Sequence, residues 1–419
     1  LTITPYLGFH LLKEKEDHDD NGDHDDQAIN KSWVYKIYNA LERPLLNSSK
    51  KRWTLIIGTF LLMIGSIFLF FNKTVVVKML PFDNKNEFQV VVDMPEGATL
   101  ERTAAVTREI AQHLSTLPEV VHYQNYIGTS APITFNGLVR HYDLRGGSNM
   151  ADIQVNLLHK EHRDRQSHDI AKALRAPIQA IGAKYGANVK IVEVPPGPPV
   201  LSTIVAEVYG PDYEMQQSIA KKIKDILHNT DDVVDIDWMV EAEQTEYKIE
   251  VDREKAMLYG ITPQQITNTI ATLFGKHEVS TLYDAAAQDN VGIVLTLDEI
   301  NSNSLDGLQG INISSKRGMM VPISELVDIK EGILAKTIYR KDQKRVVYVT
   351  ADMAGDLESP VYAILGMEDK LKNIELPSGY SLTEKYIGQP DEEQNFTVKW
   401  DGEWQITLEV FRDLGAAFL

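Results

Sequence analysis

The stretch from Trp53 to Phe71, WTLIIGTFLLMIGSIFLFF, decides how this chain is organised. It has nineteen residues and no charge, and as an α-helix it would be about 28 Å long. Because the hydrocarbon core of a bilayer is about 30 Å thick, the stretch predicts a transmembrane helix. The alternative is a core helix of a soluble protein, but a helix of this length normally keeps a polar stripe. Lys50, Lys51 and Arg52 predict that the preceding chain is cytoplasmic and the following chain lies outside.

Composition restricts the class of protein. The 419 residues are enough for several domains, and 43% hydrophobic and 24% charged residues are ordinary for folded protein. A net charge of −18 argues against nucleic-acid binding, which needs an excess of Lys and Arg. The absence of cysteine excludes disulfides, a thiolate nucleophile and Cys-ligated metals. The sequence has no nucleotide-binding glycine motif and no convincing catalytic group, so we expect neither an enzyme nor a cofactor.

Both ends of the chain are predicted to belong to a membrane region. Residues 1–12 are typical of the end of one transmembrane helix, and residues 391–419 of a return to the membrane and the start of another. We therefore expect a segment of a larger membrane protein. Residues 13–28 are acidic and contain two histidines, which favours a solvated loop over a divalent-cation site. Residues 29–47 predict an amphipathic helix on the membrane surface or on a neighbouring protein.

After the apolar stretch, one pattern of strands and helices occurs twice. Residues 76–200 follow the order β-α-β-β-α-β, which is the split ferredoxin-like arrangement. The same pattern begins again at 201–252 and resumes at 336–390, so that residues 253–335 are an insertion. The proline-rich residues 195–199 predict a stiff connector between the two units. The expected fold class is α+β, with two tandem ferredoxin-like units, an α+β insertion in the second and one transmembrane helix.

Individual elements have distinct boundary signals. Alternation predicts a strand at residues 87–93, and Thr99 is the expected N-cap of a helix at 100–114. Thr262 is the expected N-cap of a helix at 263–274, which has Pro263 at its first position. Residues 246–252 are assigned to a strand of the second unit and residues 381–387 to its last strand.

The densest group of histidine and glutamate is His159, Glu161, His162 and His168. A zinc-binding helix needs two histidines four residues apart, and these are three apart at a charged turn. The group therefore favours a solvated loop over a metal site, and we assign no metal.

Several stretches together resemble the second half of a resistance–nodulation–cell division (RND) efflux pump of the acriflavine-resistance, multidrug type. Residues 92–103, VDMPEGATLERT, are similar to the family's LPxGATxERT. Residues 249–269, IEVDREKAMLYGITPQQITNT, resemble IDxxKAxxLGVS followed by DINxT, and residues 318–324, GMMVPIS, match GxMVPLS. Residues 1–13 look like the end of the family's sixth transmembrane helix. These segments occur in the family's order along essentially the whole chain.

The resemblance implies a location and a set of partners. The chain would lie mostly in the bacterial periplasm, anchored in the inner membrane by the family's seventh transmembrane helix. The two units would be porter subdomains, and the insertion would dock to an outer-membrane channel and a periplasmic adaptor. The full-length pump would be a proton-driven homotrimer that exports drugs or other amphiphilic small molecules, with its proton-relay residues in helices outside this sequence.

The resemblance also implies residues of the substrate path. A switch loop would run between Gly128 and Gly137, and Tyr123 and Phe135 could instead be ordinary core residues. An acidic residue at position 193 could favour cationic substrates. The proposed switch-loop residues are Gly128, Thr129, Ser130, Ala131, Pro132 and Gly137, and the proposed pocket residues are Tyr123, Tyr126, Ile133, Phe135, Ile191, Glu193, Trp238 and Met239.

Two other functions stay open. A heavy-metal exporter of the same superfamily would place methionines in its periplasmic cleft as soft ligands. Met94 lies at a strand end, Met150 follows a Gly-Gly turn and Met239 stands alone, so no methionine trio is evident. The chain could also be an envelope binding or scaffold protein that transports nothing.

Overall fold

The structure is a computed structural model, which describes residues 33, 36–37, 40, 47–72, 74–76, 82–194, 200–275, 277–298 and 305–418. The segments predicted at 1–12 and 13–28, most of 29–47 and the connector at 195–199 lie outside these residues. The chain divides into two compact units, Leu1–Val77 and Lys78–Leu419, and each is described by itself.

The first unit contains helix α4, Ser49–Phe71, which includes the apolar stretch. Its segment Ser49–Leu69 is long and apolar enough to cross a bilayer, and none of it is buried against the described chain. Leu62 exposes 77% of its surface and Phe68 65%. Because large apolar side chains are exposed along the helix, a lipid environment suits it better than the interior of a soluble protein.

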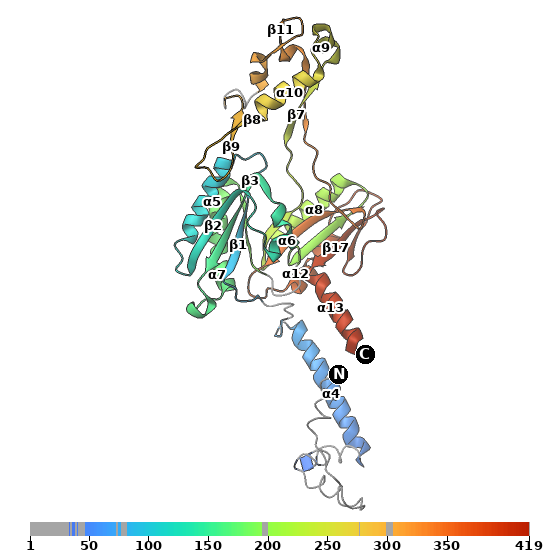
Figure 1. Ribbon diagram of the computed structural model, residues 1–419. Coiled ribbons are helices and arrows are strands. Elements are labelled where there is room, and N and C mark those ends of the chain that lie inside the picture. The colour runs from blue at the N-terminus through green and yellow to red at the C-terminus, as the bar shows by residue number, and fades with distance from the viewer. Residues whose placement is uncertain are drawn as a thin grey trace, which may run out of the picture. The chain divides into compact units, whose positions relative to one another are not determined.

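Module 1, residues 82–194, is a four-stranded antiparallel sheet with helices α5 and α7 packed on one face (Figure 1). The strands lie in the order β2-β3-β1-β4, which places Val90 of β1 between Ile153 of β3 and Ile191 of β4. Thr99 caps α5 by accepting a hydrogen bond from the backbone N–H of Arg102. The elements are β1 (Glu87–Asp93), α5 (Leu100–Leu114), β2 (Val120–Thr129), α6 (Phe135–Arg140), the 3-10 turn η1 (Tyr142–Leu144), β3 (Gly146–Leu157), η2 (Lys160–His162), α7 (Ser167–Tyr185) and β4 (Asn188–Val192).

Module 2, residues 200–244 and 334–402, repeats this layout with a five-stranded sheet. Its strand order is β16-β17-β5-β15-β6, and helices α8 and α12 share the core of one face. Trp400, Phe396 and Tyr209 are its largest fully buried side chains. The elements are β5 (Ile204–Tyr209), α8 (Tyr213–His228), β6 (Val233–Trp238), β13 (Arg340–Lys341), β14 (Lys344–Arg345), β15 (Val347–Met353), α12 (Pro360–Lys372), β16 (Leu382–Lys385) and β17 (Phe396–Gly402).

Two strands of module 2 differ from the sequence-based assignment. The strand expected at 381–387 forms as β16, but it lies at the sheet edge, parallel to β17. The position beside β5 belongs to β17, whose residues were assigned to the return to the membrane. β17 takes this position because Phe396, Val398 and Trp400 alternate along it and all are buried in the core.

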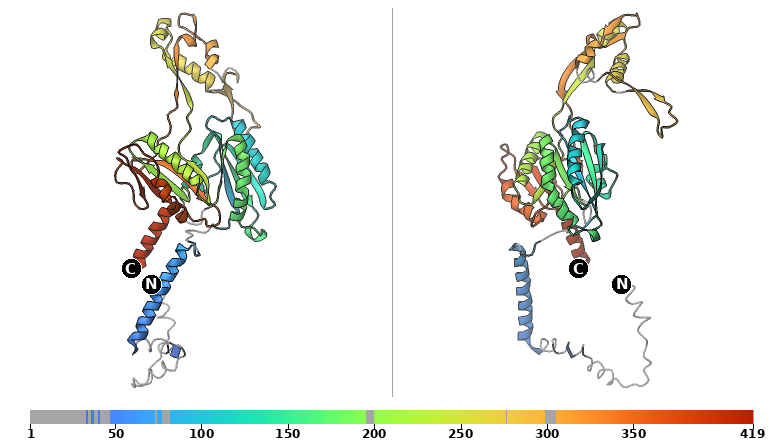
Figure 2. Two further views of the ribbon diagram at one scale, coloured as in Figure 1. Left: turned by 180° about the vertical axis from the view of Figure 1, so that it is seen from behind. Right: turned by 90° about the vertical axis from the view of Figure 1, so that its left-hand side faces the viewer.

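The insertion, residues 245–333, is joined to module 2 by a two-stranded ribbon. Strand β7 (Thr245–Val251) was assigned to the second unit's sheet, but among the described strands it pairs with β12 (Val327–Ile333) alone. Thr262 and Gln265 form a capping box at the start of α10, as the sequence predicts for this helix. The other elements are α9 (Arg253–Tyr259), α10 (Pro263–Phe274), the hairpin β8 (His277–Leu282) and β9 (Val291–Leu295), η3 (Leu305–Gly310), β10 (Asn312–Ser314), β11 (Met320–Pro322) and η4 (Ile323–Glu325). Figure 2 shows β8 and β9 as an extended arm beside α10.

Helix α13, Glu403–Phe418, follows β17 directly. Its start is held on module 2, because the indole N–H of Trp404 donates to the carbonyl of Tyr386 at 2.9 Å. Phe411 and Phe418 further along expose 70% and 89% of their surface.

Candidate functional site

Modules 1 and 2 meet where β4 lies beside β6. Lys190 of β4 pairs with Asp237 of β6, and Arg175 of α7 pairs with Asp235 at 2.8 Å. Asp235 also accepts the backbone N–H of Ile191 at 3.2 Å. Its φ of +52° marks a bulge in β6, which turns this side chain toward module 1.

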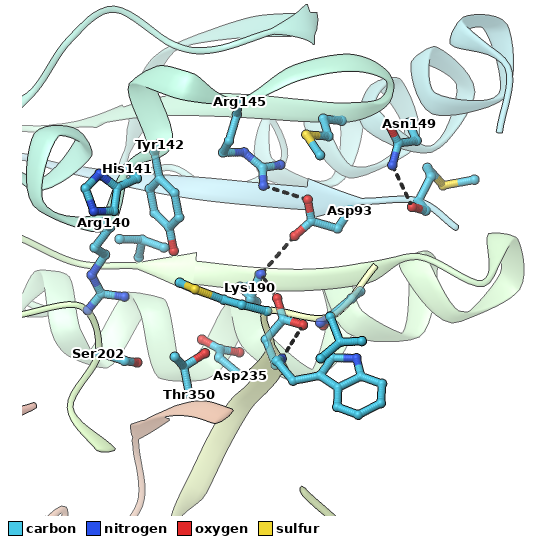
Figure 3. A pocket seen from close by; sticks show the side chains of 18 of the residues that line it. Asp93, Arg140, His141, Tyr142, Arg145, Asn149, Lys190, Ser202, Asp235 and Thr350 are labelled. Carbon is cyan, nitrogen blue, oxygen red and sulfur yellow. Dashed lines mark hydrogen bonds and ion pairs between the residues drawn. The ribbon is translucent and has the colours of Figure 1, made fainter. Parts of the chain in front are cut away.

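A cavity of about 460 Å³ lies beside this contact and has walls from both modules (Figure 3). Asp93 lies between two cations at its base. The guanidinium of Arg145 is 2.6 Å from Asp93, and the ammonium of Lys190 is 2.8 Å from it. Burial would raise the pKa of Asp93, but Lys190 and Arg145 outweigh burial and hold that pKa below its ordinary value. These groups therefore stay charged at neutral pH and form a fixed polar base.

A second bridge joins the modules on the same cavity wall. Arg140, the last residue of α6, donates to both oxygens of Asp352 on β15, at 3.0 and 3.4 Å. Asp352 also accepts from Ser202 and from the backbone and hydroxyl of Thr203. Burial would raise the pKa of Asp352, but Arg140 and these donors hold it well below its ordinary value.

A larger cavity of about 780 Å³ shares part of this wall. His141, Arg145, Met150, Leu201, Met239 and Tyr339 line both cavities. The larger cavity adds apolar side chains, among them Val139, Leu144 and Val205, and the ring of Tyr348. The two cavities therefore have a common wall and together line one cleft between the modules, which we call the cleft.

The base of the larger cavity is an ionic group on the sheet of module 2. Lys341 is 2.5 Å from Glu207 and also pairs with Asp401, while Lys399 is 3.2 Å from Glu207. The hydroxyl of Tyr209 donates to Glu207 at 2.9 Å. Burial, reinforced by Asp401, raises the pKa of Glu207. This cavity thus combines apolar walls with a paired, charged base.

Some of the predicted pocket residues come together in the cleft. Trp238 lines the smaller cavity and Met239 lines both. Ile191 is buried in the core of module 1, and with Glu193 it lines a third, small cavity. Glu193 accepts from His168 at 2.9 Å.

Other predicted residues lie away from the cavities described. Tyr123 and Tyr126 are on the edge strand β2, where Tyr126 donates to Gln124 at 2.8 Å. Ile133 exposes 69% of its surface. Phe135 begins α6, and its side chain is outside the described part of the chain.

The predicted switch loop is shorter than its sequence range. Gly128, with φ of +77°, and Thr129 still belong to β2. The backbone N–H of Ala131 donates to Asp152 at 3.0 Å, and Ser130 donates to the carbonyl of Asp143. Pro132 is exposed, and Gly137 lies inside α6, where its N–H donates to Thr134.

His168 differs from its expected surroundings. The sequence grouped it with His159, Glu161 and His162 in a solvated loop, but it lies at the N-terminal end of α7 against module 2. Its Nε2 is 2.7 Å from Glu358, and its ring stacks on Phe82 with centroids 4.2 Å apart.

Sequence reasoning missed several cleft residues. Lys190 carried a signal, because a charge inside the apolar strand NVKIV is costly unless it is paired. The sequence indicates no methionine trio, but Met94, Met150 and Met239 all line the smaller cavity.

Residues 1–400 match the model of the AcrB/AcrD/AcrF family. The chain belongs to this family. Its members are RND transporters of the inner membrane, which agrees with the resemblance found in the sequence. The chain also resembles individual members. It is 24% identical over 175 residues to the swarming motility protein SwrC of Bacillus subtilis, across 42% of this chain and 16% of SwrC. It is 25% identical over 195 residues to the cobalt-zinc-cadmium resistance protein CzcA of Cupriavidus metallidurans, across 44% of this chain and 18% of CzcA.

Solved structures agree with the family in fold. A crystal structure of a heavy metal efflux pump superposes with a TM-score of 0.64 at 17% identity, over 93% of this chain and 38% of that chain. A second crystal form of a heavy metal efflux pump gives a TM-score of 0.64 at 16% identity. The chain thus has the mixed α+β fold of RND pumps. It spans well under half the length of the proteins it matches.

Proposed function

We propose that modules 1 and 2 are the porter subdomains of a proton-driven RND efflux pump and that the cleft is part of its substrate path. The observation that carries this proposal is the pair of adjacent cavities that share one wall between the modules, in a chain of a transporter family. The strand orders β2-β3-β1-β4 and β17-β5-β15-β6 support two ferredoxin-like porter subdomains.

The larger cavity favours an amphiphilic organic substrate. Its volume of about 780 Å³ suits a drug-sized molecule. Val139, Leu144 and Val205 offer apolar contact, which is not directional and tolerates varied shapes. The ionic base around Glu207 and Lys341 could orient a polar head group. The chain would lie largely in the periplasm of an inner-membrane pump, with α4 as its membrane anchor.

A heavy-metal cation is the second candidate substrate. Three thioethers, from Met94, Met150 and Met239, line the smaller cavity, and thioethers are soft ligands that suit copper(I) or silver. The names of CzcA and of the superposed heavy metal efflux pumps refer to metal transport by those proteins. Both observations support a metal substrate, which is also compatible with the AcrB/AcrD/AcrF family.

Substitutions in the full-length pump distinguish the two substrates. Met239→Leu removes a thioether at nearly constant volume, so it should lower tolerance to copper(I) or silver and leave organic-cation and detergent efflux unchanged if metal is the substrate. Leu144→Trp narrows the larger cavity from an exposed position and should lower organic efflux instead. Met257→Leu, on exposed α9, is the matched control. Unchanged export of both classes in both variants would remove the cleft from the substrate path.

The insertion is the proposed docking region of a homotrimeric pump. Its hairpin β8–β9 exposes Tyr283, Val294 and Leu295 to solvent, as expected of a surface that meets another protein. The partners proposed from the family are a periplasmic adaptor and an outer-membrane channel. Site-directed crosslinking from Tyr283 in cells that assemble the whole pump tests this, and crosslinks only to unrelated proteins would contradict it.

A further inference from the structure

The third cavity lies where module 1, module 2 and helix α13 meet. Its volume is about 20 Å³, which is room for one water molecule. Arg140, Arg175 and Glu193 of module 1 line it, together with Asp352 of module 2 and Glu403, the first residue of α13.

Among the described residues, the charged groups around this cavity form ion pairs, except for Glu403. Each of the four cations has at least one carboxylate partner, whereas none of the ion pairs among the described residues includes Glu403. The pairs are Arg140 with Asp352 at 3.0 Å, Arg175 with Asp235 at 2.8 Å, His168 with Glu193 at 2.9 Å and Lys172 with Glu358 at 2.7 Å. An ionised Glu403 would therefore be a fifth carboxylate among four cations.

Two buried donors at the cavity also lack acceptors. Nε of Arg140 and Nη1 of Arg175 make no hydrogen bond within the described chain, although each side chain is only 8% exposed. Buried N–H groups are nearly always satisfied by protein or by ordered water. A cavity of this size, lined by these donors and by carboxylates, is suited to one bound water.

We propose that Glu403 is a proton-binding residue that, together with one water in this cavity, controls the bridge between Arg140 and Asp352. Neutral Glu403 donates a hydrogen bond to the water through its O–H and leaves Arg140 on Asp352. When the proton leaves to solvent, the Glu403 carboxylate competes with Asp352 for Arg140. Because Arg140 ends α6 and lines the cleft, the protonation of α13's first residue then alters the cleft wall.

The electrostatic surroundings agree with this assignment. Burial, followed by the charge of Asp352, raises the pKa of Glu403 to about 7, and Arg140 opposes the rise. Arg175 of α7 also lines the cavity, as does Glu193, which directly follows β4. Asp401, two residues before Glu403, is already held by Lys341 and Lys399. Glu403 therefore changes charge near neutral pH, whereas Asp352 stays ionised.

Thermal unfolding of the full chain in detergent tests the proton site. The folded state holds a proton on Glu403 between about pH 4.5 and 7 that the unfolded state has lost, so stability falls as the pH rises through this range. Glu403→Gln cannot ionise. Its Tm should equal that of the parent chain at pH 4.5 and exceed it by roughly 5 °C at pH 8.5. Glu409→Gln, on the same helix, is the control and should give one constant offset at both pH values. A constant offset for Glu403→Gln as well would overturn the proton site.

The effect on the cleft has its own readout. Because the chain has no cysteine, Val139→Cys next to Arg140 gives a single labelling site in the larger cavity. Its rate of maleimide labelling, corrected for thiolate content with an unfolded control, should change at least threefold between pH 6 and 8. The same probe combined with Glu403→Gln should show no such change. If the two probe chains, with and without the Glu403→Gln change, give the same pH profile of labelling, the proposed control of the cleft is overturned.

Arg140→Lys provides a second check that keeps a positive charge at the cavity. Lysine cannot span both Asp352 oxygens as arginine does, so Asp352 is neutralised less completely and repels an ionised Glu403 more strongly. The pH at which the Glu403→Gln difference appears should therefore rise. An unmoved midpoint would overturn the link between Glu403 and the bridge. None of these measurements involves transport, so they stand apart from the choice of substrate.

Discussion

Replacing His168 by Gln should destabilise the folded chain in a strongly pH-dependent way. His168 lies between Glu193 and Glu358, at 2.9 and 2.7 Å, and so joins module 1 to module 2. Burial alone would lower its pKa, but the hydrogen bonds to the two glutamates outweigh burial and raise the pKa from 6.5 to about 9.

The size of the effect follows from this shift. Each pKa unit corresponds to about 1.36 kcal/mol, so a rise from 6.5 to about 9 contributes about 3 kcal/mol to the free energy of unfolding. Because the folded-state pKa is the higher one, this stability is fully present below pH 6.5 and is lost as the pH rises through about 9. Gln keeps one hydrogen bond but carries no charge, so the variant lacks the part of the unfolding free energy that depends on the histidine's charge.

The assay is thermal unfolding of the full chain in detergent at pH 6 and at pH 10. At pH 6 the variant should unfold roughly 5 °C below the parent chain, and at pH 10 the difference should nearly vanish. His122→Gln, on the exposed strand β2, is the matched control and should leave the Tm unchanged at both pH values. A His168→Gln difference of the same size at pH 6 and pH 10 would refute the charged bridge.

Three further substitutions test packing and capping. Gly210→Ala would place its Cβ 2.2 Å from the Phe396 ring and should cost about 1–3 kcal/mol of unfolding free energy. Gly366→Ala, exposed inside α12 with open space around it, should instead stabilise by about 0.5–1 kcal/mol, and equal effects at the two glycines would contradict the packing of β17 on β5. Thr262→Ala removes the capping box of α10 and should cost about 1 kcal/mol, seen as faster amide exchange in the first turn of α10, while Thr267→Ala on the same helix leaves that turn unchanged.

Local patterns were sufficient to predict most elements of the two modules. Strand β1 and helices α5 and α10 have the expected bounds, because alternation, spacing and the N-caps Thr99 and Thr262 act within a few residues. β17 was assigned to the return to the membrane, although Phe396, Val398 and Trp400 alternate along it with polar residues, among them Lys399. That lysine is 1% exposed and is neutralised by Glu207, which lies 192 residues away in the sequence. No local rule reveals such a partner.

The sequence predicted residues of the cleft only where they are neighbours along the chain. Trp238 and Met239 are neighbours and both line the cleft. Met94 and Met150 reach the same cavity only because β1 and β3 pair, with Asp93 opposite Met150. The register that brings them there depends on the whole sheet, so sequence spacing understated the methionine content of the cleft.

The two kinds of contact in this chain have different physical consequences. Each module buries its own apolar core. Between them lie ion pairs, such as Arg175 with Asp235 and Lys190 with Asp237, whose attraction largely offsets their desolvation and whose charges regain water on separation. Opening this contact separates these ion pairs, whereas opening a module would expose its apolar core. A cleft between modules joined in this way can change width at a modest free-energy cost while both sheets stay intact, and that is the property a substrate path needs.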